Sequence, residues 1–191
     1  MSSLAILICT LPERFDKLKR LRNILDPQID RYKDRVSIYL HDGGRQIPTG
    51  TKRNLLIEQS TSDYFCFCDD DDQVCSFYVD EIVKAIETGP DVVTFKGWMT
   101  TNGARRVDWT IKLGEKYEER NGHYYRWPNH LSVFKRALVN RFKFPDVWIQ
   151  EDYIWSKAIR DSGVLKTEVH IPMQLYHYQF EHTQSVQNRR R

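Results

Sequence analysis

Four consecutive aspartates, at positions 69 to 72, are the densest cluster of chemically active side chains in this chain of 191 residues. Like charges this close repel one another, and a bound cation would offset that repulsion. The run directly follows the apolar residues 64–68 instead of lying in a polar stretch, which counts against an ordinary solvated acidic loop. Hard cations prefer oxygen ligands and often combine one or two carboxylates with phosphate oxygens. The run therefore predicts a Mn²⁺ or Mg²⁺ site beside a diphosphate.

A candidate phosphate site is the segment of residues 49–54, Thr-Gly-Thr-Lys-Arg-Asn, where a helix is expected to begin. Free N–H groups at the start of a helix attract anions, and Lys52 and Arg53 add positive charge for the same phosphates. The alternative is that both are ordinary basic residues on a solvated helix face. The segment alone is compatible with both interpretations.

The elements expected around these residues alternate between strand and helix in the first half of the chain. Short apolar runs predict strands at residues 4–9, 36–41, 64–68 and 91–95. Helical spacing predicts a helix from Phe15 that Pro27 closes, one from Leu55, and one over 78–86 that ends at Gly89. This alternation predicts right-handed βαβ units and a largely parallel sheet covered on both faces. Ligands collect beyond the carboxyl ends of such strands, so Thr10, Asp42 and Asp69 are expected to face one crevice.

The second half of the chain is less regular. Residues 98–128 are polar and aromatic and are expected to be irregular. Helices are expected around residues 131–140 and 152–161, and strands at 164–171 and 174–178. Residues 183–191 are expected to form a polar, basic tail.

Composition narrows the class of protein. The chain is 40% apolar and 29% charged, which is ordinary for a soluble globular domain. Its net charge of +3 is milder than that of most nucleic-acid-binding domains. The four cysteines lie within or beside apolar runs and lack zinc-finger spacing, which favours a reducing compartment. No signal peptide and no apolar run of roughly 20 residues is evident, so we expect a soluble, cytoplasmic protein, at most peripheral to a membrane.

Three motifs, taken in order, carry a resemblance to a known family. They are Phe-Cys-Asp-Asp-Asp-Asp at residues 67–72, Lys-Arg-Asn at 52–54, and Gln-Glu-Asp-Tyr at 150–153, which an amphipathic helix and Gly163 follow. From Leu4 to about His182, the sequence resembles the inverting family 2 glycosyltransferases of the GT-A fold. The resemblance implies one Rossmann-like α/β domain over residues 1–182, with a mixed, mostly parallel sheet flanked by helices. A nucleotide-sugar half would cover about residues 1–97 and an acceptor half about 98–182.

The resemblance also implies a role for each site residue. Asp42 would contact the donor's base, Thr10 and Arg14 would line the nucleoside pocket, and Lys52 and Arg53 would bind the diphosphate. Asp71 would be the principal metal ligand, and Asp69 would contact the ribose or the metal. Asp72 would support the donor sugar or the groups that surround the metal ligands. Asp70 is an additional carboxylate at the variable position of the motif, and it leaves the choice of metal ligand open among these neighbours.

Asp152 would be the general base that takes the proton of the acceptor hydroxyl while that oxygen attacks the sugar. An acidic helix cap is the alternative for Glu151 and Asp152, and the two roles are compatible.

Two histidines have two interpretations each. His177 would complete the metal site, as a late histidine does in some members of the fold, or it would simply pack within an aromatic strand. His130 would touch the donor sugar or the acceptor, or it would be a packed residue without a role.

The acceptor is expected to bind against residues 98–136, where basic and aromatic side chains alternate. This pattern suits a saccharide, with a UDP-sugar as the expected donor, but it also suits nucleic acid such as a hydroxymethylated DNA base. Functions of another class are a metal-dependent nucleotidyltransferase or nuclease, and a non-catalytic metal- or sugar-binding module.

Overall fold

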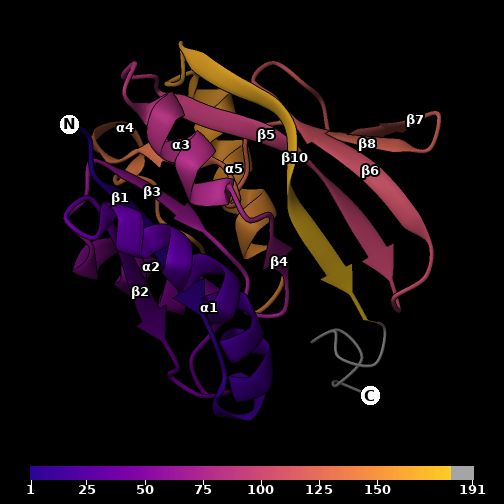
Figure 1. Cartoon of the computed structure of the whole chain (residues 1–191). Helices are drawn as coiled ribbons and strands as arrows, with labels where there is room; N and C mark the ends of the chain where they lie inside the picture. The colour runs from indigo at the N-terminus through magenta and orange to yellow at the C-terminus, as the bar shows by residue number, and fades with distance from the viewer. Residues whose placement is uncertain (182–191) are drawn as a thin grey trace.

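The N-terminal half of the structure, a computed structural model that describes residues 1–181, alternates strands and helices as predicted (Figure 1). Strand β1 (Leu4–Cys9) leads through a short 3₁₀ turn to helix α1 (Phe15–Ile29), and β2 (Val36–His41) leads to α2 (Thr49–Gln59). The next strand, β3 (Tyr64–Phe67), ends immediately before the aspartate run. Strand β1 pairs in parallel with β2 on one side and with β3 on the other.

The rest of the chain extends this sheet. Its other elements are α3 (Tyr78–Ile86), α4 (Arg136–Val139), α5 (Glu151–Ser162), β4 (Gln73–Val74), β5 (Val92–Thr101), β6 (Arg106–Ile111), β7 (Glu118–Arg120), β8 (His123–Arg126), β9 (Val133–Lys135) and β10 (Glu168–Phe180). Along the sheet the strand order is β2-β1-β3-β9-β5-β6-β8-β7, and β10 pairs with β4 and β5. The parallel pairing of β5 with β10 is the longest, while β9 is antiparallel to both of its neighbours. The predicted mixed, mostly parallel α/β sheet is confirmed.

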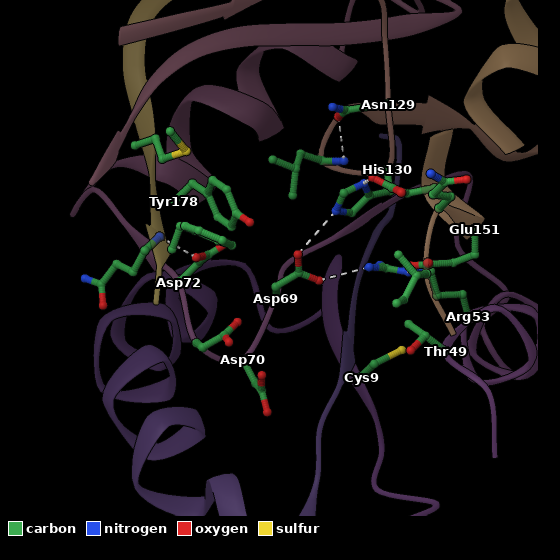
Figure 2. A pocket seen from close by; sticks show the side chains of 18 of the residues that line it. Cys9, Thr49, Arg53, Asp69, Asp70, Asp72, Asn129, His130, Glu151 and Tyr178 are labelled. Carbon is green, nitrogen blue, oxygen red and sulfur yellow. Dashed lines mark hydrogen bonds and ion pairs between the residues drawn. The ribbon is translucent and has the colours of Figure 1, made fainter. Parts of the chain in front are cut away.

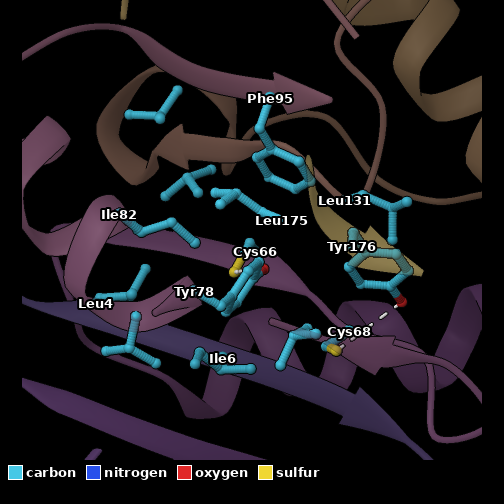
Figure 3. Packing of buried hydrophobic residues seen from close by; sticks show 14 of the residues in the cluster. Leu4, Ile6, Cys66, Cys68, Tyr78, Ile82, Phe95, Leu131, Leu175 and Tyr176 are labelled. Atoms are coloured by element: carbon cyan, nitrogen blue, oxygen red, sulfur yellow. Dashed lines mark hydrogen bonds between the residues drawn. The ribbon is translucent and has the colours of Figure 1, made fainter. Parts of the chain in front are cut away.

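Each face of the sheet has its own hydrophobic core. Side chains alternate along β1, so Leu4, Ile6 and Ile8 pack with α1 and α3 in one core, while Ala5 and Leu7 pack with α2 and α5 in the other. Figure 1 shows α3 and α5 on opposite sides of the strands. Figure 3 shows the first core, where rings from β5, β10 and α3 meet the aliphatic side chains of β1. Burial on both faces explains why β1 and β3 are apolar throughout.

Pro27 does not close its helix, contrary to prediction. Helix α1 continues past Pro27 to Ile29. Proline removes one backbone hydrogen bond of the helix, and contacts of the following turn offset that loss. In that turn, Gln28 is buried, and its amide group donates to the carbonyls of Ile24 and Cys75 and accepts from the Val79 amide.

Residues 98–128 are not irregular, and this expectation was wrong. Strand β5 runs on to Thr101, and β6, β7 and β8 add three more strands at the edge of the sheet. Strand β6 is mostly buried and β8 is partly buried, but all three residues of β7 are exposed, so no apolar alternation marks β7.

Two further boundaries differ from the prediction. Residues 131–140 form the short strand β9 followed by the single turn α4, and not one helix. The two expected late strands are one strand, β10, whose pairing with β5 shifts register between Ile171 and Tyr176. These shifts account for the apparent break in the sequence pattern.

Other expectations concern the cysteines, the membrane and the domain limits. All four cysteines are free thiols. No helix within residues 1–181 is long and apolar enough to cross a bilayer. Residue 182 and the predicted tail 183–191 lie outside the described residues, and the division into donor and acceptor halves stays a prediction.

Candidate active site

A cavity of about 820 Å³ opens beyond the ends of β1 and β3. The aspartate run lines it from one side, α2 and the start of α5 line it from another, and aromatic residues of β6, β8 and β10 form the remaining wall. This is the edge of the sheet where parallel α/β folds place their ligands. Figure 2 shows Asp69 near the centre of this cavity, between His130 and Arg53.

The carboxylate of Asp69 lies against two basic side chains. Its Oδ1 lies 3.1 Å from Nη2 of Arg53, and its Oδ2 lies 3.3 Å from Nε2 of His130 (Figure 2). The backbone N–H of Asp69 donates to the hydroxyl of Tyr176 at 3.0 Å. Burial raises the pKa of this carboxyl, but Arg53 and His130 outweigh that effect and hold its pKa far below the usual range. Asp69 is therefore ionised and oriented before any ligand binds.

His130 connects Asp69 to Asp152. Its Nδ1 lies 3.2 Å from Oδ2 of Asp152, an ion pair without hydrogen-bond alignment among the described residues. Burial and the nearby Arg53 lower the pKa of His130, yet the two carboxylates together raise it to about 9. Burial likewise raises the pKa of Asp152, but the adjacent His130 and Arg53 bring it down to about 2. The imidazole is thus a cation between two carboxylates at neutral pH.

Asp70 lines the cavity but is only 1% exposed. Its two oxygens accept from Oγ1 of Thr10 at 2.7 Å and from Nη1 of Arg14 at 2.8 Å. Asp71 shares the same Arg14 nitrogen at 3.1 Å but keeps 21% of its side chain exposed. Burial raises the pKa of both carboxyls, and Arg14 opposes the rise. Asp70 therefore ties the aspartate run to the β1 loop, whereas Asp71 remains accessible.

Asp72 is fully buried and is held by β10. Its Oδ2 accepts from the hydroxyl of Tyr176 at 2.8 Å, and its Oδ1 accepts from the backbone N–H of Gln179 at 2.8 Å. Burial, and then the neighbouring Asp69, raise the pKa of Asp72 well above its usual value. The Tyr176 hydroxyl thus links the first and last aspartates of the run.

Lys52 and Arg53 are not on a solvated helix face, because each is only 4% exposed. Nε of Arg53 contacts Oε1 of Glu151 at 3.3 Å, and its guanidinium packs over the ring of Phe67. Nη1 of Arg53 is buried with no partner among residues 1–181. Nζ of Lys52 donates to the Gly44 carbonyl. Both side chains line the cavity.

The start of α2 also supports the segment that carries Asp152. Asn54 exchanges two hydrogen bonds of 2.9 Å with the backbone of Phe144, and the Gly50 amide donates to the Val147 carbonyl. One amide of the expected anion site is therefore already used. Gln150 adopts a left-handed φ of 67° immediately before α5, which begins at Glu151.

Two predicted residues lie apart from this arrangement. Asp42 is exposed and does not line the cavity. His177 does not line it either; its ring stacks on Trp98, its Nε2 lies 2.8 Å from Oγ1 of Thr100, and its Nδ1 contacts Gln179. Strand alternation puts His177 on the face opposite Tyr176 and Tyr178. Their predicted roles as base contact and metal ligand gain no support from this placement.

The remaining predicted residues come together: Thr10, Arg14, Lys52, Arg53, Asp69, Asp70, Asp71, Asp72 and Asp152 all line the cavity. Within the described part of the chain, no three His, Cys, Asp or Glu side chains form a metal site by themselves. Asp69 and Asp71 nevertheless expose carboxylate to the cavity, which suits a cation whose other ligands are phosphate oxygens.

Sequence reasoning missed Tyr176 and gave Glu151 only the role of a helix cap. Tyr176 directly precedes His177 in β10, and the alternation of side chains along that strand was the available signal. Nothing in the sequence marks Glu151 as the partner of Arg53.

Comparison with known families gives a direct match. The sequence model described as glycosyl transferase family 2 matches residues 18–148, which is more than half of the 191 residues. No curated protein sequence matches the chain.

Solved structures of TarS from S. aureus have a similar fold. One, of TarS itself, has a TM-score of 0.66 at 14% identity and covers 93% of this chain and 36% of that one. TarS 1–349 in complex with UDP-GlcNAc has a TM-score of 0.65 at 13% identity, with coverage of 93% and 58%. TarS 1–349 in complex with UDP has a TM-score of 0.65 at 14% identity, with coverage of 93% and 60%. This chain therefore spans at most about three-fifths of these chains.

A mixed sheet of this topology, with acidic residues beyond the end of its third strand, is that of the GT-A fold. The chain belongs to glycosyl transferase family 2. The resemblance stated from its motifs is confirmed, and membership favours glycosyl transfer over the nuclease, nucleotidyltransferase and non-catalytic alternatives.

Proposed function

We propose that this chain transfers a sugar from a UDP-sugar to an acceptor hydroxyl, with inversion at the sugar carbon. The observation that carries the proposal is the link through His130, which holds Asp69 of the donor motif and Asp152 within 3.3 and 3.2 Å of one imidazole. Donor-binding and base residues thus share one cavity. The likeness to TarS structures in complex with UDP-GlcNAc and with UDP supports the choice of donor.

Asp71 and Asp69 would hold Mn²⁺ or Mg²⁺ together with the donor's diphosphate. The cation would supply positive charge to the departing UDP. Lys52, buried and without a carboxylate partner among residues 1–181, would bind the same phosphates.

Asp152 acts as the base. The acceptor oxygen forms a bond to C1 of the sugar from one side, the bond from C1 to the UDP oxygen breaks on the other, and the hydroxyl proton passes to Asp152. A carboxylate with a pKa of about 2 is ionised at neutral pH. It suffices as the acceptor of this proton because the hydroxyl becomes strongly acidic as its oxygen bonds to carbon.

The test is UDP release from UDP-GlcNAc and from other UDP-sugars, with Mn²⁺ and with water as the acceptor. Asp71→Ala should lose metal-dependent donor binding in calorimetry, because it removes one of the two carboxylates of the run that are exposed to the cavity. Asp152→Asn should bind the donor normally and lose turnover by about two orders of magnitude or more.

Asp161→Asn is the matched control, because Asp161 lies at the far end of α5 and outside the cavity. Full turnover by Asp152→Asn would refute its role as the base. Unchanged Mn²⁺-dependent binding by Asp71→Ala would refute the metal site.

A further inference from the structure

One cation on the acceptor side of the cavity lacks a carboxylate partner. Among residues 1–181, five arginine and lysine side chains line the cavity besides His130, which lies between Asp69 and Asp152: Arg14, Arg45, Lys52, Arg53 and Arg126. Ion pairs hold three of them, since Arg14 contacts Asp70 and Asp71, Arg45 contacts Glu13, and Arg53 contacts Asp69 and Glu151. Lys52 lies beside the aspartate run on the donor side. Only Arg126, at the end of β8, stands on the other wall of the cavity.

Arg126 is held in place by aromatic rings and backbone. Its guanidinium carbon lies 4.3 Å from the ring centre of Tyr117 and 4.8 Å from that of Tyr124. Its Nη1 donates to the carbonyls of Tyr125, at 2.7 Å, and Glu118, at 3.3 Å. No carboxylate of residues 1–181 lies within 4.0 Å of it. A guanidinium oriented in this way is preorganised to bind a planar or tetrahedral anion through its remaining N–H groups.

The position of Arg126 relates it to the base. The ring of Tyr117 that supports Arg126 also meets Tyr153 edge-on, with 5.5 Å between ring centres, and Tyr153 directly follows Asp152. Burial raises the pKa of Tyr117, its hydrogen bond with Asn129 lowers it, and the charges of Asp152 and Arg126 act on it with opposite signs, so both charges are close enough to influence this phenol. An anion on Arg126 would therefore bind close to the hydroxyl that Asp152 deprotonates.

We propose that Arg126 binds a phosphate or carboxylate group of the acceptor, and that the acceptor is an anionic saccharide. The proposal rests on the proposed function, since it assigns the second substrate of the same cavity. Aromatic faces of Trp109, Tyr124 and Tyr178 line the wall beside Arg126 and suit a sugar ring. A nucleic acid would need a row of free cations for successive phosphates, whereas the described residues of this wall offer Arg126 as a single one.

The experiment compares three probes that share one ring: glucose, glucose 6-phosphate and glucuronate. Binding is measured by calorimetry with UDP and Mn²⁺ present, so that the donor site is filled and cannot take the anionic probes. Wild type should bind both anionic probes at least tenfold more tightly than glucose. Arg126→Gln should remove this preference, and Arg126→Lys, which keeps the charge but loses the planar fork, should retain only part of it. Circular dichroism confirms that each variant is folded.

Arg120→Gln is the matched control. Arg120 lies in the same hairpin and packs at 3.6 Å over the ring of Tyr125, but it is paired with Glu115 and Glu118 and does not line the cavity. Arg120→Gln should prefer the two anionic probes over glucose to the same extent as wild type.

Equal or undetectable binding of all three probes by wild type would overturn the proposal, as would an unchanged preference in Arg126→Gln. Tighter binding of a ten-nucleotide single strand than of glucose 6-phosphate, lost as salt rises, would also overturn it in favour of a nucleic acid. UDP release from UDP-sugar by the same wild-type sample separates this failure from failure of the proposed function. If UDP is released but no probe preference is found, only the assignment of the acceptor is wrong.

Discussion

The imidazole of His130 lies against Asp152, with 3.2 Å between Nδ1 and Oδ2. A turn holds the ring in this position: the carbonyl of His130 accepts from the Phe67 amide at 3.0 Å, and the side chain of Asn129 caps the following amide at 3.1 Å. Because Phe67 is the last residue of β3, the strand that presents the aspartates also positions the imidazole. His130 is therefore a positioning residue for both carboxylates that it contacts.

Replacing His130 by Gln should lower kcat for UDP-sugar turnover by about 10- to 100-fold, because Asp152 loses the group that orients it. The KM for the donor should change less than about threefold, since Arg53 still holds Asp69. Initial rates across donor concentrations give both constants. His123→Gln is the control, because His123 bonds to Thr110 and does not line the cavity. An equal loss of kcat in the two variants would show that His130 has no special role.

The pH profile of kcat/KM should lack an acid limb from Asp152 between pH 4 and 7. The pKa of Asp152 is lowered to about 2, so falling pH leaves this carboxylate ionised throughout that interval. In His130→Gln, the main group that lowers this pKa is gone, and burial should move the limb upward, toward the measured range. Rates of UDP release between pH 4 and 8 test both statements. A wild-type limb near pH 5 to 6 that moves in His130→Gln would contradict the assigned pKa.

Asp70 and Asp71 should differ in what their loss costs. Asp70→Ala removes two hydrogen bonds, one of them to a charged and half-buried Arg14, and should lower the free energy of unfolding by about 2–3 kcal/mol. Asp71→Ala removes a partly exposed ion pair and should cost less than about 1 kcal/mol. Urea denaturation of the metal-free proteins measures both. The reverse order would show that Asp71, and not Asp70, ties the aspartate run to β1.

Gly50→Ala should lower the free energy of unfolding strongly for so small a change in side chain. A methyl group at this position in α2 would overlap the carbonyl oxygen of Pro145, which is backbone and cannot turn aside. The expected loss is about 2–4 kcal/mol. Because the displaced segment leads into Asp152, turnover should fall as well. In Gly103→Ala, the matched variant, the methyl meets nothing within 4 Å, and the positive φ of 72° should cost about 1 kcal/mol. Equal unfolding midpoints for the two would contradict the close approach of α2 to this segment.

The first half of the fold could be predicted because its signals are local. Strands β1 and β3 are buried on both faces and read as unbroken apolar runs, so the position of Asp69 after a strand follows from neighbouring residues. Strand β7 gives no such signal, because Glu118, Glu119 and Arg120 are all exposed. Its place in the sheet depends on pairing with β8, which a local pattern does not encode.

The candidate site, too, could be predicted only in part from the sequence. Charge and motif order indicated Asp71 and Asp152, but the bridge through His130 joins residues 61 positions apart on one side and 22 on the other. The buried pairing of Arg53 with Glu151 spans 98 positions. Such contacts form only when the sheet has assembled, and the sequence between the paired residues does not indicate that they pair.

Arg53 has a mechanical consequence. Its guanidinium is buried and holds one carboxylate from the end of β3 and another from the start of α5, while Asn54 on the next position grips the backbone at Phe144. These ion pairs connect the two walls of the cavity, and separating the walls would leave a buried charge without its partners. This enzyme should not capture its donor as a hinged clamshell. We expect the two walls to keep their separation when substrates bind, so that only side chains and loops at the opening of the cavity move.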